Sequence, residues 1–105
     1  MRVAITSTGN SLESDLDRRF ARCNYFVIFD STSGSVEFIP NPNKNLEENA
    51  GPASVELLTS RKTDKIISGE FGTKIKAMLD SLKIQLIILP DNKRNIGQII
   101  ELLNH

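Results

Sequence analysis

Residues 65–73 constrain the fold of this chain more than any other stretch. Two adjacent β-branched residues, Ile66 and Ile67, precede a Gly-Glu-Phe-Gly segment that leads into Thr73. Such a pair is typical of a short strand that is buried on both faces. Beyond Thr73 the apolar residues follow helical spacing, at Ile75, Met78, Leu79 and Leu82. The sequence therefore predicts a strand that enters a helix through a glycine turn, which is where an open α/β sheet usually binds a ligand.

The remaining patterns predict further strands and helices. Strands are expected at residues 2–7, 25–29, 35–39 and 84–89, one helical turn at 18–23, an exposed connection at 40–49, and helices at 52–61 and 96–103. Asn95 and Gln98 have the spacing of a capping box at the start of the last helix.

The element order, β-β-β-α-β-α-β-α, limits how the strands can pair. The first three strands are expected to form an antiparallel meander. Right-handed crossovers place the last two strands parallel to the first, with the 84–89 strand buried and helices on both faces of the sheet. We therefore expect one domain over residues 1–105, with a ribonuclease-H-like three-layer α/β/α fold and a mixed sheet of about five strands.

Composition and charge narrow the classes of function. The 13 Lys and Arg residues balance 13 Asp and Glu residues, so the chain lacks the overall positive charge that attracts nucleic acid or an anionic membrane. No apolar run reaches the ~20 residues that cross a bilayer, and no signal-peptide pattern is present, so we expect a cytoplasmic protein with no membrane partner. Cys23 and His105 are the only cysteine and histidine, which argues against multi-cysteine metal sites and a Ser-His-Asp triad.

Several short elements occur together in the order and spacing of a known family. They are Met1-Arg2-Val3-Ala4-Ile5, Phe20-Ala21-Arg22-Cys23-Asn24-Tyr25-Phe26, Asn41-Pro42, Ala50-Gly51 and Gly69-Glu70-Phe71-Gly72. Over nearly the whole chain the sequence resembles the dinitrogenase iron-molybdenum cofactor biosynthesis family. It departs from the family at Ala21, where glycine is usual, and at Arg19, where many members have histidine. The resemblance implies a non-enzymatic protein that binds, carries or protects an anionic iron-molybdenum or other metal-sulfur cluster, or its precursor, and works with cluster-assembly proteins.

Backbone amides offer one way to hold such an anion. Gly69, Gly72 and Thr73 stand at a predicted helix start, where free N–H groups and the helix dipole favour negative charge, and Gly51 stands at the start of the preceding helix. Glu70 would repel the same anion unless its side chain points away. The glycines also fit a reading as turn geometry alone, and the segment is not a nucleotide P-loop because the Gly-Lys-Ser/Thr ending is missing.

Arginine guanidinium groups and a cysteine thiolate offer another way to hold such an anion. Arg18, Arg19 and Arg22 form the densest basic cluster, next to the sole cysteine, Cys23. We expect cluster contacts from Arg19, Arg22 and Cys23, with Cys23 as the candidate metal ligand, and the family signature adds Phe20 to this set. The alternatives are that the arginines form surface ion pairs with the neighbouring acidic loop and that Cys23 is a small buried core residue.

Two other classes of function are compatible with such a fold. A two-metal nuclease needs several carboxylates that converge on the central strands. The first strand carries none, and Asp64, Glu70 and Asp91 near strand ends do not by themselves make such a site. A module that binds another protein without any cofactor is the alternative to a cluster carrier, and exposure of Phe20 or Phe71 would favour it.

Overall fold

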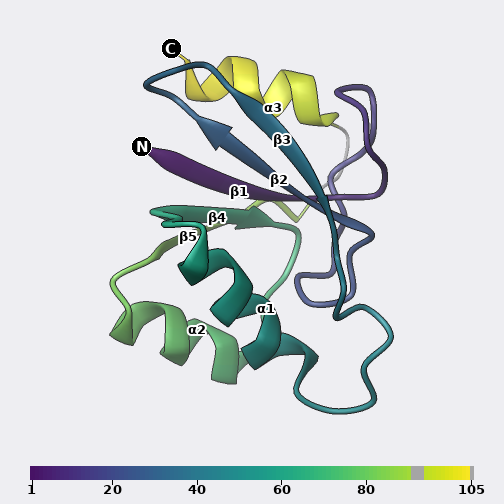
Figure 1. Cartoon of the computed structure of the whole chain (residues 1–105), viewed down its shortest axis with the longest axis vertical. Coiled ribbons are helices and arrows are strands. Elements are labelled where there is room, and N and C mark those ends of the chain that lie inside the picture. Colours follow the sequence, from purple (N-terminus) through teal and green to yellow (C-terminus); the bar gives the residue numbers. More distant parts are fainter. Residues whose placement is uncertain (91–93, 105) are drawn as a thin grey trace.

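The computed structural model describes residues 1–90 and 94–104, so Asp91 and His105 lie outside the described residues. The elements follow the predicted order along the chain (Figure 1). They are β1 (Arg2–Ser7), β2 (Tyr25–Asp30), β3 (Val36–Pro40), α1 (Ala50–Ser60), β4 (Lys65–Ser68), α2 (Thr73–Ser81), β5 (Gln85–Ile88) and α3 (Ile96–Leu103).

The strands form one five-stranded sheet in the order β3-β2-β1-β4-β5, which confirms the predicted mixed sheet. β2 runs antiparallel to both β1 and β3, whereas β4 is parallel to β1 and to β5. In the central register Ala4 is paired with Ile28 of β2 on one side and with Ile66 of β4 on the other. β1 therefore lies at the centre, with the carboxyl ends of β1 and β4 side by side.

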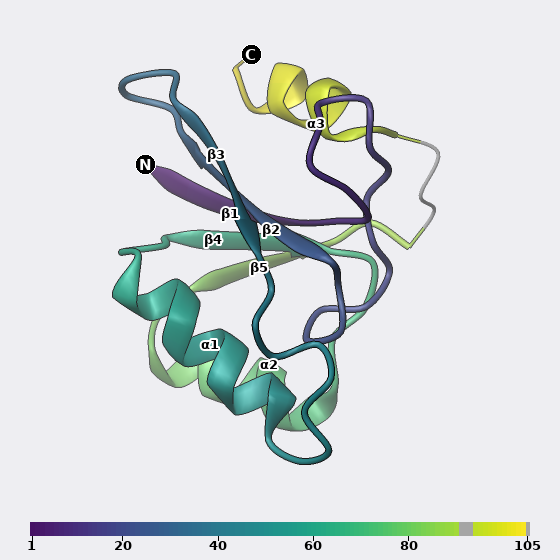
Figure 2. The ribbon, with the colours of Figure 1, turned by 45° about the vertical axis from the view of Figure 1, so that its right-hand side comes forward.

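Helices cover both faces of the sheet (Figures 1 and 2). α1 and α2 lie on one face, and α3 lies on the other. This arrangement follows from strand alternation, because successive side chains point to opposite faces. Ala4 and Ile66 belong to the core beneath α1 and α2, whereas Ile5 and Ile67 belong to the core beneath α3.

The glycine turn between β4 and α2 has the predicted form. Ile66 and Ile67 are buried in β4, Gly72 is the N-cap of α2, and the helix begins at Thr73. The predicted capping box at α3 is also present. The Gln98 N–H donates to the Asn95 side chain at 2.8 Å, and the Asn95 N–H donates to the Gln98 side chain at 2.9 Å.

Two local predictions are wrong. Residues 18–23 do not form a helical turn. The carbonyls of Ala21 and Cys23 instead accept hydrogen bonds from the Asn41 side chain, at 2.8 and 2.9 Å, which satisfies them without a helix. β5 is parallel as expected but not buried, because it is the edge strand of the sheet and its Ile88 is exposed.

The loop after β1 is folded back rather than free in solvent. The Thr8 N–H donates to the Asp15 carbonyl at 3.0 Å. The loop is also joined to the start of α3, where the N–H groups of Ile96 and Gly97 donate to the carbonyls of Ser14 and Leu12 at 2.9 and 2.8 Å. These bonds bring residues 17–19 to the carboxyl end of the sheet.

Candidate functional site

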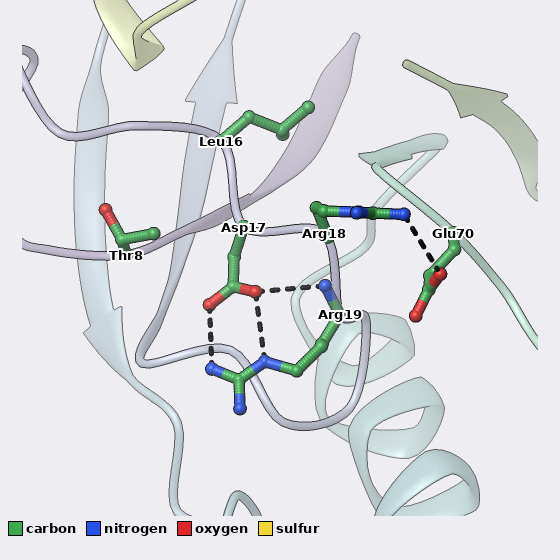
Figure 3. A pocket seen from close by; sticks show the side chains of 6 residues that line it. All are labelled: Thr8, Leu16, Asp17, Arg18, Arg19 and Glu70. Carbon is green, nitrogen blue, oxygen red and sulfur yellow. Dashed lines mark hydrogen bonds and ion pairs between the residues drawn. The ribbon is translucent and has the colours of Figure 1, made fainter. Parts of the chain in front are cut away.

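An open pocket of about 530 Å³ lies at the carboxyl ends of β1 and β4. Thr8 follows β1 and Glu70 follows β4, so two adjacent parallel strands lead into the pocket. Figure 3 shows the lining side chains, Thr8, Leu16, Asp17, Arg18, Arg19 and Glu70. This is the edge at which an open α/β sheet binds its ligands.

Asp17 and Arg19 form a fixed pair within the pocket. One Asp17 carboxylate oxygen accepts the Arg19 backbone N–H at 2.9 Å and its Nε–H at 3.2 Å, and the other accepts Nη2–H at 3.3 Å (Figure 3). The Asp17 side chain is 5% exposed, whereas that of Arg19 is 56% exposed. The hydrogen bonds to Asp17, followed by its negative charge, raise the pKa of Arg19 above the usual value. Arg19 is therefore a permanently charged guanidinium, held from beneath and open to solvent.

The strands hold Asp17 in place through its backbone. The Asp17 N–H donates to the Thr6 carbonyl at 2.9 Å, and its own carbonyl accepts the Thr6 hydroxyl at 2.8 Å. The Gly69 N–H donates to the same Asp17 carbonyl at 3.4 Å. The segment that carries the arginines is thus joined to both β1 and the turn after β4.

Arg18 and Glu70 form a looser pair on the other side of the pocket (Figure 3). Arg18 Nη2 lies 3.9 Å from Glu70 Oε2, and both side chains are 63% exposed. An exposed pair at this separation is well screened by water and contributes about 0 to 1 kcal/mol. Unlike Arg19, Arg18 is therefore free to exchange its partner at little cost.

The glycines selected from the sequence have different surroundings. A Cβ at Gly69 would lie 2.5 Å from Arg18 Cα, so Gly69 is required by close backbone packing. A Cβ at Gly72 would meet nothing within 4 Å, and Gly72 and Thr73 are both exposed at the start of α2. A Cβ at Gly51 would lie 2.6 Å from Ile75 Cδ1, which places Gly51 in the contact between α1 and α2.

Arg22 does not join the other two arginines in the pocket. Its guanidinium donates to the backbone carbonyls of Lys44 and Leu46 in the connection before α1. Nearby, the Lys44 ammonium donates to the Asn24 side chain at 3.1 Å. In this structure Arg22 thus holds the long connection against the end of the sheet.

Phe20 and Cys23 belong to the core under α1 and α2. The Phe20 ring centroid lies 5.3 Å from that of Phe71 and 6.0 Å from that of Phe26. Phe20 and Phe71 are both buried, so the exposure that would favour a protein-binding module is not observed. Cys23 is 0% exposed, and burial, together with the charge of Asp17, raises the pKa of its thiol to about 12. The side chain is thus a protonated core group rather than a thiolate at the surface.

The Cys23 thiol gives a pH-dependent prediction. Its pKa rises from the ordinary 9.0 to about 12 in the folded protein. Between these values the unfolded chain binds fewer protons than the native state, so stability falls as pH rises. From pH 8 to about pH 10.5 we expect the parent to lose about 2 kcal/mol more stability than Cys23→Ala, measured by urea unfolding at each pH. All other ionisable groups are common to the two proteins, so equal losses would contradict a buried, protonated thiol.

Sequence reasoning missed most of the residues that line the pocket. Thr8, Leu16, Asp17 and Glu70 are not among the binding residues that the sequence predicts, and Arg18 belongs only to the basic cluster there. The available signal was positional: Thr8 directly follows the central strand, and Glu70 lies in the turn after its parallel neighbour. Residues at the carboxyl ends of adjacent parallel strands converge on one site.

Within residues 1–90 and 94–104, no group of three or more His, Cys, Asp or Glu side chains could hold a metal ion. In the same part of the chain, no helix has the length and apolar character needed to cross a membrane. A second, more apolar pocket of about 490 Å³ lies between α1 and α2, with Pro52, Val55, Met78 and Leu82 in its lining.

The fold and the pocket define an α/β protein with two arginines at the carboxyl edge of a mixed sheet. The chain matches the family described as "Dinitrogenase iron-molybdenum cofactor" over residues 1–104, and it therefore belongs to this family. No match was found among curated proteins.

Two solved structures are similar in fold. The apo form of the orange protein from Desulfovibrio gigas has a TM-score of 0.88 and 23% sequence identity, over 97% of this chain and 85% of that chain. A NifB-like protein from Thermotoga, described as belonging to the DUF35 family, has a TM-score of 0.81 and 29% identity, over 97% of this chain and 85% of that chain.

Proposed function

We propose that this protein binds and carries an anionic metal-sulfur cluster, either iron-molybdenum or another molybdenum- or iron-sulfur species, or a precursor of one. The observation that carries the proposal is the pair of solvent-accessible arginines, Arg18 and Arg19, in one pocket at the carboxyl ends of β1 and β4. Membership of the iron-molybdenum cofactor family supports this cargo over other anions.

The chemistry of the pocket suits the outer sulfides of such a cluster. Arg19 is held by Asp17 on one edge, which leaves N–H groups on its other edge for an anion. Arg18 supplies a second guanidinium that is only loosely paired. The first turn of α2 begins at Thr73, and its backbone N–H groups, which lack helical partners, add a weaker attraction for negative charge.

This proposal divides the sequence-derived residues into two groups. Arg18 and Arg19 contact the cargo, with the backbone from Gly69 through Gly72 to Thr73 forming the adjoining rim. Supporting roles fall to the other candidates, Phe20, Arg22, Cys23 and Gly51, because their observed contacts lie in the core, the long connection and the helix contact. Recognition through the cluster's sulfides therefore does not require Cys23 as a metal ligand.

The proposal extends to the setting of this activity. The protein acts as one domain and without a reaction of its own, in the cytoplasm, and exchanges its cargo with cluster-assembly proteins. We also assign its fold to the ribonuclease-H-like class, a classification supported by the 3-2-1-4-5 strand order with β2 antiparallel to its neighbours.

Anoxic titration with tetrathiomolybdate, alone and with copper, tests the proposal directly. We expect the metal-sulfide absorption to co-elute with the protein in gel filtration. Arg18→Ala and Arg19→Ala should each weaken binding about tenfold or more, because each removes charge-assisted hydrogen bonds worth about 1.5 to 3 kcal/mol. The dissociation constant is obtained from the absorption change on titration.

Arg61→Ala is the matched control. Arg61 pairs with Glu37 at 3.0 Å, and its carbonyl accepts the Nε–H of Arg2 at the amino end of β1, away from the pocket. This variant removes the same charge and should bind like the parent. Absence of co-elution with tetrathiomolybdate, with copper and with an iron-molybdenum cofactor precursor would overturn the proposal. An equal loss in all three arginine variants would show that binding is not localised to the pocket.

A further inference from the structure

Glu70 stands out in the pocket because its carboxylate carries the same negative charge as the proposed cargo and would repel it. The pocket holds two carboxylates, Asp17 and Glu70, against two guanidinium groups, Arg18 and Arg19. Asp17 has a supporting role, since it is buried and accepts three hydrogen bonds from Arg19. Glu70 accepts no such set of bonds, and its only ion pair within the described residues is the 3.9 Å contact with Arg18.

The backbone keeps Glu70 close to Arg18. Gly69 packs so tightly on residue 18 that an added Cβ would lie 2.5 Å from Arg18 Cα. The Gly69 N–H also donates to the Asp17 carbonyl at 3.4 Å. Residues 18 and 70 are thus fixed side by side by their neighbours, while their side chains remain 63% exposed and free to move.

We propose that Glu70 competes with the cargo for Arg18. The cargo displaces the Glu70 carboxylate from Arg18 on binding, and Glu70 pairs with Arg18 again as the cargo leaves. This inference rests on the proposed function and adds a means of release to it. A tethered carboxylate is present at high effective concentration. It therefore lowers the affinity for an anion and speeds its dissociation, as suits a carrier that must pass its cargo on.

Glu70→Gln tests the inference, with tetrathiomolybdate as the probe. The substitution keeps the size of the side chain and removes its charge. We expect binding to become about fivefold tighter, the upper limit for an exposed ion pair, with most of the change in the dissociation rate. Equilibrium titration gives the affinity, and a stopped-flow chase gives the dissociation rate.

Glu101→Gln is the matched control, because Glu101 is exposed on α3, across the sheet from α1 and α2. It makes the same change in net charge and should leave both constants unaltered. A double-mutant cycle with Arg18→Gln adds a second readout: the gain from Glu70→Gln should shrink when Arg18 is absent.

The outcomes separate this inference from the proposed function. If the parent binds the probe and Glu70→Gln binds equally or more weakly, the competitor role is overturned while cluster carriage stands. A gain that persists in full without Arg18, or that Glu101→Gln reproduces, also overturns it. If neither the parent nor Glu70→Gln binds, cluster carriage fails and the competitor role fails with it.

Discussion

Phe20→Ala should destabilise the protein by about 3 to 5 kcal/mol, the usual cost of removing a buried aromatic side chain. Phe20 is buried, and its ring contacts both Phe26 of β2 and Phe71 of the turn before α2. Native domains are stable by about 5 to 15 kcal/mol, so this loss is a large share of the total. Urea unfolding, followed by circular dichroism, gives the change in free energy.

Leu102→Ala is the control for the Phe20 experiment. Leu102 is the exposed apolar residue near the end of α3, and its truncation should change stability by no more than about 0.5 kcal/mol. The Phe20 result also bears on the site. A loss of stability below 1 kcal/mol combined with a loss of cluster binding would contradict the core position and return Phe20 to the binding surface.

The parts of the fold that could be predicted depend on contacts that are local or follow general rules. The β4-turn-α2 segment is recognisable because Ile66, Ile67 and the helical stripe from Ile75 carry the pattern within a few residues. The parallel orientation of β4 relative to β1 agrees with the crossover rule applied to the sequence. The capping box at Asn95 is equally local.

The parts that could not be predicted depend on partners far along the chain. Arg22 looks like a site residue in sequence, yet its partners are the carbonyls of Lys44 and Leu46. Asp17 looks like any member of an acidic loop, yet only the bonds of its backbone to Thr6 and Gly69 bury it beneath Arg19. No periodicity or propensity records such contacts. Only the tertiary structure shows that Arg18 and Arg19 line the pocket while Arg22 binds the long connection.

The buried state of Cys23 illustrates the same limit. A lone cysteine beside three arginines is equally compatible with an activated thiolate and with a core residue. The tertiary structure decides between them, because Cys23 lies fully buried in the core beneath α1 and α2, where the Asn41 amide also donates to its backbone carbonyl. The raised pKa of the thiol follows from that placement, and the sequence carries no local signal of it.

Gly69→Val should cost about 3 kcal/mol or more, whereas Gly72→Val in the same turn should cost less than about 1 kcal/mol. The two glycines are indistinguishable in sequence. At Gly69 an added Cβ would lie 2.5 Å from the Arg18 Cα and 3.1 Å from the Arg18 carbonyl oxygen, and a backbone atom cannot move aside as a side chain can. Overpacking of this kind costs about 1 to 3 kcal/mol for flexible neighbours. At Gly72 the same atom meets open space.

Gly72 also has an extended backbone, with φ −71° and ψ 157°, which any residue can adopt, so its substitution loses only N-cap preference. Urea unfolding of the two variants gives the comparison, and equal costs would contradict the close contact at Gly69. The Gly69 contact also matters for the pocket, because it holds Arg18 beside Glu70.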